Sequence, residues 1–303
     1  MDIVSEALSQ REAAPPPPRL YHYTDATGAL GILSAGQVWF THFEYLNDRL
    51  EGHYFVEVLR RWLARPGEGA ERAVWARLVV AQGLSLLRSF GTPYVFSLSE
   101  DRDSLSQWRG YGGDGAGYAV GFDGQALKSI LRPKSRPPTF ARVDTVKVVY
   151  DEDEQHRLLT RFAERWPSDG DRLHDVATAA LAELVFAPSF KHPAFREERE
   201  WRVVLAGQGV EMARTQPNVA EEQRGWAAAM QNWLHFRPPP RRGLVPYLAV
   251  GSELLPLRHL IREVRLGPRI PRDEGERALE LLLATRPEEL GTVTMTYSSA
   301  PYR

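Results

Sequence analysis

The chain has 303 residues, of which 43% are hydrophobic and 25% are charged, a composition typical of a globular protein with a substantial core. Its net charge of −1 provides no overall basic field for nucleic acid, so any such contact would have to be local. The lack of cysteine excludes disulfides, thiolate metal sites and a cysteine nucleophile.

The N-terminal stretch predicts neither export nor membrane insertion. Residues 1–14 have no basic start and no apolar core of the kind found in a secretory signal. No apolar run approaches the ~20 residues needed to cross a bilayer. We therefore expect a cytoplasmic protein with no membrane partner. Residues 1–18 end in four prolines and predict a disordered tail, so the folded domain is expected over residues 19–303.

Strands and helices are predicted in mixed order after this tail. Arg19–Thr24 alternates and is rich in aromatic residues, which predicts a strand followed by a short helix capped at Thr24 or Asp25. Further strands are expected over 37–40, 93–99, 118–122, 143–150, 244–250, 261–266 and 292–297. Helices are expected over 47–63, 71–90, 104–108, 218–234 and 274–283, and within 151–187. This order indicates a single α+β domain with helical insertions.

The segment Glu198–Arg202 carries charge directly before the apolar run Val203–Leu205, which predicts a strand. If the strand includes the charged residues, Glu198 and Glu200 share one face, with carboxylates roughly 6–7 Å apart. Like charges that close raise at least one pKa, as in acid–base catalysis. The alternative is a solvated edge strand whose charges pair with the neighbouring arginines.

Five further residues, in three groups, have both a structural and a functional interpretation. His22 lies in the middle of the first predicted strand, where a lone histidine is commonly structural. Ser97 and Ser99 share one face of a strand and could be neutral filler. Trp108 and Tyr111 are three residues apart, so they share a helical face if the turn continues. They would then pack in the core or form a stacking platform for a planar ligand.

Metal and phosphate motifs are weak in this chain. Asp48, Glu51 and His53 could be imagined as metal ligands, but they lack a His-x-x-x-His or similar spacing, so we expect no metal. The glycines between 110 and 117 form neither G-x-G-x-x-G nor a P-loop. A G-x-S-x-G nucleophile elbow is also missing.

Several short motifs nevertheless occur in a characteristic order. Together they make the chain resemble a bacterial family, domain of unknown function 2971, from Leu20 to Arg303. That family in turn resembles a remote branch of the ADP-ribosyltransferase superfamily. The motifs are His22-Tyr23-Thr24, Asn47-Asp48-x-x-Glu51, Phe96-Ser97-Leu98-Ser99, Trp108-x-x-Tyr111 with its glycine-rich follower, Glu198-x-Glu200-Trp201-Arg202, and the closing residues 298–303.

The resemblance implies a fold and a substrate. ADP-ribosyltransferases hold NAD, their substrate, in a cleft of a split, strongly bent mixed β-sheet, and they need no metal. A first-strand histidine or arginine binds the adenosine ribose, a Ser-x-Ser strand contributes to the site, and aromatic rings pack on the nicotinamide. The matching NAD-binding positions in this chain are His22, Tyr23, Thr24, Ser97, Ser99, Trp108 and Tyr111.

The resemblance also assigns the catalytic carboxylates. A late strand of these enzymes carries the catalytic glutamate, often as Glu-x-Glu, and Glu198 and Glu200 match it. Breaking the nicotinamide–ribose bond develops an oxocarbenium-like cation, which a carboxylate stabilises electrostatically. On this basis Glu200 would stabilise the cation, and Glu198 would orient or deprotonate the incoming nucleophile.

Two functions of different classes follow from the sequence. The first is an NAD-dependent ADP-ribosyltransferase, or an NAD glycohydrolase, whose acceptor is a protein, a nucleic acid, a small molecule or water. The second is a non-enzymatic module that binds a nucleotide or nucleic acid on the same fold. Its contact surface would be the basic, proline-rich segments 132–138 and 237–242. The toxin, phage-defence and metabolite-modification roles of such proteins all remain compatible with the sequence.

Overall fold

The computed structural model describes residues 15–46, 51–65, 74–83, 93–130, 142–166, 171–206, 228–238 and 243–302. Within these residues the chain forms one α+β fold around a ten-stranded mixed sheet that does not close into a barrel. This confirms the predicted fold class. The strands are β1 (Arg19–Thr24), β2 (Val38–His42), β3 (Tyr94–Ser99), β4 (Tyr118–Asp123), β5 (Arg142–Lys147), β6 (Glu200–Ala206), β7 (Leu234–Arg237), β8 (Val245–Val250), β9 (Ile261–Leu266) and β10 (Thr294–Tyr297).

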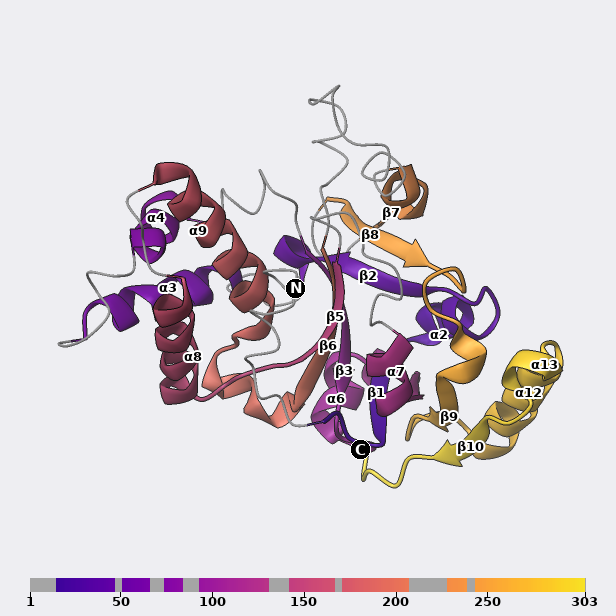
Figure 1. Ribbon diagram of the computed structural model, residues 1–303. Coiled ribbons are helices and arrows are strands. Elements are labelled where there is room, and N and C mark those ends of the chain that lie inside the picture. Colours follow the sequence, from indigo (N-terminus) through magenta and orange to yellow (C-terminus); the bar gives the residue numbers. More distant parts are fainter. Residues whose placement is uncertain are drawn as a thin grey trace.

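Most of the described helices lie at the two ends of this sheet. The α-helices are α2 (Ala26–Leu33), α3 (Glu51–Leu63), α4 (Val74–Gln82), α6 (Leu105–Gly110), α7 (Gly124–Ile130), α8 (Glu152–Arg165), α9 (Arg172–Phe186), α12 (Arg272–Ala284) and α13 (Pro287–Leu290). Short 3-10 turns are η1 (Phe43–Tyr45), η2 (Gly113–Gly115), η3 (Ala187–Ser189), η4 (Pro193–Glu198) and η5 (Leu257–His259). Figure 1 shows α3, α4, α8 and α9 gathered at one end of the molecule, with α12 and α13 at the other.

The sheet forks at β3. One edge of β3 pairs with β6 along its whole length, from Tyr94 opposite Leu205 to Ser99 opposite Glu200. The other edge pairs with β2 only at its beginning, where Val95 lies opposite Thr41, and with β1 only at its end, where Ser99 lies opposite Tyr21. β1 continues into β4, β9 and β10, whereas β2 continues into β8 and β7. The trunk β3–β6–β5 therefore carries two diverging branches.

Two large, separate apolar cores support the fork, and a third, small cluster contains Tyr21, Tyr23, Trp108 and Ala119. One lies within the helical end, where residues of α3, α4, α8 and α9 pack around the fully buried Trp75 and Phe55. The other covers one face of the sheet and includes Phe40, Phe96 and Phe122. Apolar side chains alternate along β3 and β6, so this face is apolar while the opposite face is free to carry polar groups.

The start of the fold differs from the sequence prediction. Residues 1–14 of the predicted tail lie outside the described residues, but the prolines that follow contact the domain. The Pro16 carbonyl accepts a hydrogen bond from Gln125 Nε2 at 2.8 Å, and the Pro18 carbonyl accepts one from the Gly124 N–H at 3.3 Å. A proline lacks the N–H donor but keeps its carbonyl acceptor. The proline run that the sequence placed in the tail is therefore part of the described fold from residue 15 onward.

Candidate functional site

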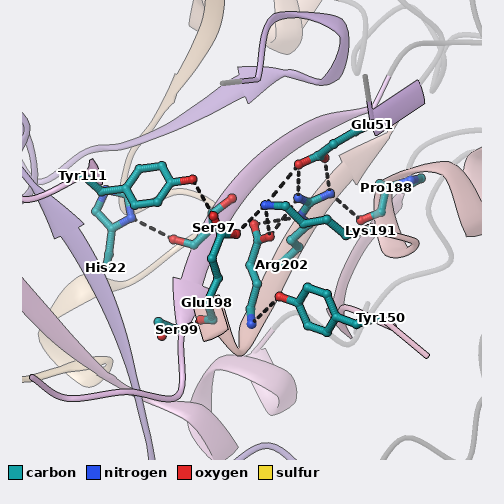
Figure 2. A network of polar contacts seen from close by, with 11 residues as sticks. His22, Glu51, Ser97, Ser99, Tyr111, Tyr150, Pro188, Lys191, Glu198 and Arg202 are labelled. Carbon is teal, nitrogen blue, oxygen red and sulfur yellow. Dashed lines mark hydrogen bonds and ion pairs between the residues drawn. The ribbon is translucent and has the colours of Figure 1, made fainter. Parts of the chain in front are cut away.

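A group of buried charges lies where the helical end meets β6. Arg202 bonds both oxygens of Glu200, through Nε at 2.8 Å and Nη2 at 2.8 Å. The same guanidinium reaches Glu51 of α3, with Nη1 2.8 Å from Oε2. Lys191 Nζ lies 3.0 Å from Glu200, 3.2 Å from Glu51 and in contact with Glu198. We call these five residues the charge network (Figure 2).

The charge network contains more negative than positive groups. Three carboxylates face two cations, so at full ionisation it carries one unit of negative charge. Burial alone would raise the pKa of the Glu200 carboxyl, but Arg202 and Lys191 outweigh burial and lower that pKa to about 2. Burial raises the pKa of Glu198; Lys191 opposes this shift and the charge of Glu200 adds to it. The two carboxyls therefore differ in their affinity for a proton. Glu200 stays ionised, whereas Glu198 takes up a proton more readily.

The backbone geometry that brings Glu198 and Glu200 to Lys191 differs from the one that the strand pattern predicted. The strand begins at Glu200, and Glu198 is the last residue of η4. Arg199 between them adopts a left-handed conformation with φ 45° and ψ 49°. The two side chains therefore do not meet through strand alternation, and the expectation that a common strand face brings them together is wrong. They meet because the left-handed turn aims both carboxylates at Lys191.

The predicted serines lie on the strand next to Glu200. In the pairing of β3 with β6, Ser99 stands opposite Glu200 and Ser97 opposite Arg202. Opposite residues share a face of the sheet, so both serines face the charge network. The Ser97 side chain contributes to the lowered pKa of the Glu200 carboxyl, after Arg202 and Lys191. Ser99 Oγ donates to the main-chain carbonyl of Glu198 at 2.7 Å.

Two tyrosines complete this face. The Tyr111 hydroxyl donates to Glu198 Oε1 at 2.9 Å, which places this predicted residue directly on the charge network. The Tyr150 hydroxyl accepts a hydrogen bond from the Glu200 N–H at 3.0 Å. Burial raises the pKa of both phenols, and Glu198 adds to the shift at Tyr111 and Glu200 at Tyr150. Both tyrosines are therefore neutral hydrogen-bonding groups.

His22 occupies the fork of the sheet rather than the face of the charge network. Tyr21 stands opposite Ser99, so strand alternation directs His22 toward the other face, where its ring lies 4.4 Å from that of Phe96. Its Nδ1 is 2.8 Å from the Ser97 carbonyl oxygen, at the point where β3 loses its partner on that edge. Burial lowers the pKa of His22 to about 4, and the charge of Arg237 contributes. The imidazole is neutral and donates through Nδ1 to the carbonyl.

The remaining predicted residues are more deeply packed. The Trp108 ring is fully buried, lies edge-on to Tyr23 at 4.8 Å and donates through Nε1 to Asp103 at 2.8 Å. The Tyr23 hydroxyl donates to the Asp101 carbonyl at 2.8 Å. Thr24, at the end of β1, is also buried. These contacts correspond to core packing, the structural interpretation considered for Trp108, and they leave its ring faces covered by protein.

Lys191 is the member of the charge network that sequence reasoning missed. It lies in an irregular segment between η3 and η4, where no strand or helix period marks its neighbours. Glu51 was considered only as a metal ligand and as part of a motif whose Asn47 and Asp48 lie outside the described residues.

Within the described ranges, no group of three or more His, Asp or Glu side chains is arranged to hold a metal ion. No described helix has the length and apolar character needed to cross a membrane.

The fold and the site define an α+β protein with a forked open sheet and a buried charge network beside the fork. Residues 107–203 match the model of a family described as a protein of unknown function, DUF2971, so this segment is similar to that family. The matched segment contains Tyr111, Lys191, Glu198, Glu200 and Arg202. No curated protein and no solved structure matches the chain.

Proposed function

We propose that this protein is an ADP-ribosyltransferase that cleaves the nicotinamide–ribose bond of NAD and transfers ADP-ribose to an acceptor. The observation that carries the proposal is the meeting of Glu198 and Glu200 on Lys191, beside the serine pair of the adjacent strand. His22 lies one strand further on, at the fork. Of the residues that the superfamily resemblance singled out, Trp108 and Tyr111 belong to α6 and its C-terminal end, and the others come from three neighbouring strands and the turn before β6.

The reaction suits the unequal charge of the network. The bond from ribose C1′ to the nicotinamide nitrogen breaks, and its electron pair leaves with nicotinamide. C1′ becomes cationic until an oxygen of the acceptor, or of water, bonds to it and gives up a proton. A preorganised surplus of negative charge stabilises such a cation because the dipoles and charges need no rearrangement.

The two carboxylates have different parts in this scheme. Both oxygens of Glu200 are held by Arg202 and Lys191, so Glu200 acts as a fixed charge through its field. The Glu198 side chain is more exposed, at 12% against 7% for Glu200, and its pKa is raised by burial. Glu198 is therefore suited to accept the proton of the incoming nucleophile.

A second candidate function is a non-enzymatic module that binds a nucleotide or nucleic acid. The observation in its favour is the full engagement of Glu200 by two buried cations, an arrangement also found in structural ion networks. Of the basic segments expected to form its contact surface, 132–138 lies outside the described residues, and in 237–242 only Arg237 and Pro238 are described.

The test measures nicotinamide release from NAD by the wild type and by Glu200→Gln, Glu198→Gln and Glu51→Gln. Glu51 is the matched control, because it is as buried as Glu200 and pairs with the same two cations. Removing one partner from a buried pair can itself cost about 3–5 kcal/mol of stability. Each variant is therefore first shown to be folded by its melting curve at the assay temperature.

We expect Glu200→Gln to lower nicotinamide release by roughly 10²–10³ with little change in NAD affinity, because its charge is needed only as the cation develops. Glu198→Gln should reduce transfer to an acceptor more than it reduces nicotinamide release. If Glu200→Gln and Glu51→Gln lower nicotinamide release equally, the loss comes from disruption of the charge network and not from a specific role of Glu200. Undiminished release in Glu200→Gln would remove Glu200 from the mechanism, and no release by the wild type would leave the binding module as the function.

A further inference from the structure

A second polar group lies on the branch β2–β8–β7, where Thr41 stands opposite Val95 and Tyr247. The rings of Trp39 and Tyr247 lie 4.9 Å apart. The guanidinium of Arg237 lies over both of them, 6.0 Å from the Trp39 centroid and 5.8 Å from that of Tyr247. Cations over aromatic faces are held by the ring quadrupole, which orients a guanidinium without using its N–H donors.

Arg237 differs from the buried arginines of the sheet in its partners. Arg202 and Arg265 each have carboxylates within 4.0 Å. Among the described residues, no carboxylate lies that close to Arg237, and its hydrogen bond goes to the Thr41 hydroxyl at 3.1 Å. Burial lowers the pKa of Arg237. A half-buried cation with no carboxylate in contact is stabilised when an anion joins it.

The position of Arg237 connects it to the fork. Thr41, which it contacts, pairs with Val95 at the beginning of β3. On the other branch, the charge of Arg237 lowers the pKa of His22, and Asp25, the N-cap of α2, interacts with Arg237 electrostatically. Arg237 therefore stands at the opening between the two branches, with most of its five N–H donors not engaged by described protein groups.

We propose that Arg237, held by Trp39, Tyr247 and Thr41 at the fork of the sheet, binds the diphosphate of a nucleotide ligand. The fork of a planar guanidinium matches two phosphate oxygens at once, and such charge-assisted pairs are about twice as strong as neutral hydrogen bonds. The inference rests on the proposed function only in naming NAD as the source of that diphosphate. It assigns this contact to β7, outside the family match, whereas the sequence placed residue 237 only in the contact surface of the non-enzymatic module.

The test is calorimetric titration of ADP-ribose into the wild type, Arg237→Gln and Arg262→Gln. ADP-ribose carries the diphosphate but has no nicotinamide, so binding is read without any turnover. Arg262 is the control because it is also a partly exposed arginine of the sheet, and it is already paired with Asp123 at 3.6 Å. Both variants remove one positive charge, so long-range attraction to the ligand changes equally.

We expect Arg237→Gln to weaken ADP-ribose binding about ten- to a hundred-fold, since a hydrogen bond to a charged group contributes roughly 1.5–3 kcal/mol. Arg262→Gln should change it less than about threefold, as an exposed charge does. Equal weakening in both variants, or no ADP-ribose binding by the wild type, would overturn the inference. So would a single-stranded oligonucleotide that binds through Arg237 while ADP-ribose does not.

The inference and the proposed function can fail separately. If ADP-ribose binding depends on Arg237 but no nicotinamide is released from NAD, the diphosphate site stands and the transferase proposal fails. If Arg237→Gln turns over NAD with an unchanged KM, the transferase proposal stands and the diphosphate site is wrong.

Discussion

His22 is a neutral histidine placed where a strand loses its partner. Its Nδ1–H replaces the missing strand neighbour at the Ser97 carbonyl, so the ring contributes to the fold whether or not it also binds a ligand. Burial lowers its pKa to about 4 from an ordinary value of 6.5. In the unfolded chain the imidazole takes up a proton first, so acidification favours unfolding. The stability that His22 contributes is present above pH 6.5 and is lost as the pH falls toward 4.

This linkage gives a prediction for the variant His22→Asn, which keeps a donor near the carbonyl and removes the titrating group. We expect the free energy of unfolding of the wild type to fall by about 2 kcal/mol more than that of the variant between pH 7.5 and pH 5. Urea unfolding at the two pH values measures the difference. The control His53→Gln, at an exposed position of α3, should keep the wild-type pH dependence. A variant as acid-sensitive as the wild type would contradict the assignment.

At the residue scale, the sequence predicted most residues of the candidate site, but it did not predict the contacts that bring them together. Ser97, Ser99, Tyr111, Glu198 and Glu200 do gather on one face. Their partner Lys191 had no pattern to reveal it, because a single basic residue in an irregular segment acquires meaning only through contacts far along the chain. The strand periodicity that placed Glu198 on a common face with Glu200 overlooked that an arginine can adopt the left-handed conformation at a strand entrance.

At the scale of elements, the joint between η4 and β6 depends on Arg199. Its left-handed conformation costs a non-glycine residue roughly 1–2 kcal/mol. The side chain is exposed and pairs with Glu100 at 2.8 Å and Asp101 at 2.8 Å, which offsets part of this cost.

We therefore expect Arg199→Gly to change the free energy of unfolding by less than about 1 kcal/mol, because relief of strain balances the lost surface pairs. Arg199→Val should destabilise by about 2 kcal/mol or more, since a β-branched residue is poorly accommodated at positive φ. Denaturant unfolding of both variants measures this. Similar stability in the two variants would mean that the backbone at this joint relaxes freely.

Most elements were predictable from local patterns. The strands β1, β3, β4 and β9 lie within a residue or two of the alternating runs that predicted them, and α3 ends at Leu63 as expected. The fork was not predictable from periodicity, because it depends on which strand meets each half of one edge of β3. That edge pairs Val95 with Thr41 and Ser99 with Tyr21, which are distant from β3 in sequence.

At the scale of the whole molecule, the charge network joins two bodies that have separate apolar cores. Glu51 belongs to the helical end, whereas Glu200 and Arg202 belong to the sheet. Buried charges with satisfied partners tie the two cores together, and loss of one partner leaves the others uncompensated.

The variant Arg202→Leu should therefore destabilise the protein by about 3–5 kcal/mol, because Glu51 and Glu200 lose their main counter-charge. Arg61→Leu, which removes an exposed pair with Glu152, should cost no more than about 1 kcal/mol. Chemical denaturation gives both values, and hydrogen exchange should report faster opening of α3 in Arg202→Leu. Equal costs for the two variants would contradict the proposed link between the cores.

The pairing of the sheet also has a consequence for how the chain is made. β1 to β6 are synthesised first and can pair among themselves, but the outer edge of β2 waits for β8 and that of β4 waits for β9. Until then both branches end in open strand edges, which are templates for wrong association. A chain arrested on the ribosome before β8 should therefore engage chaperones at two places. Since its sheet pairings are almost all distant in sequence, the completed protein should fold slowly for its size.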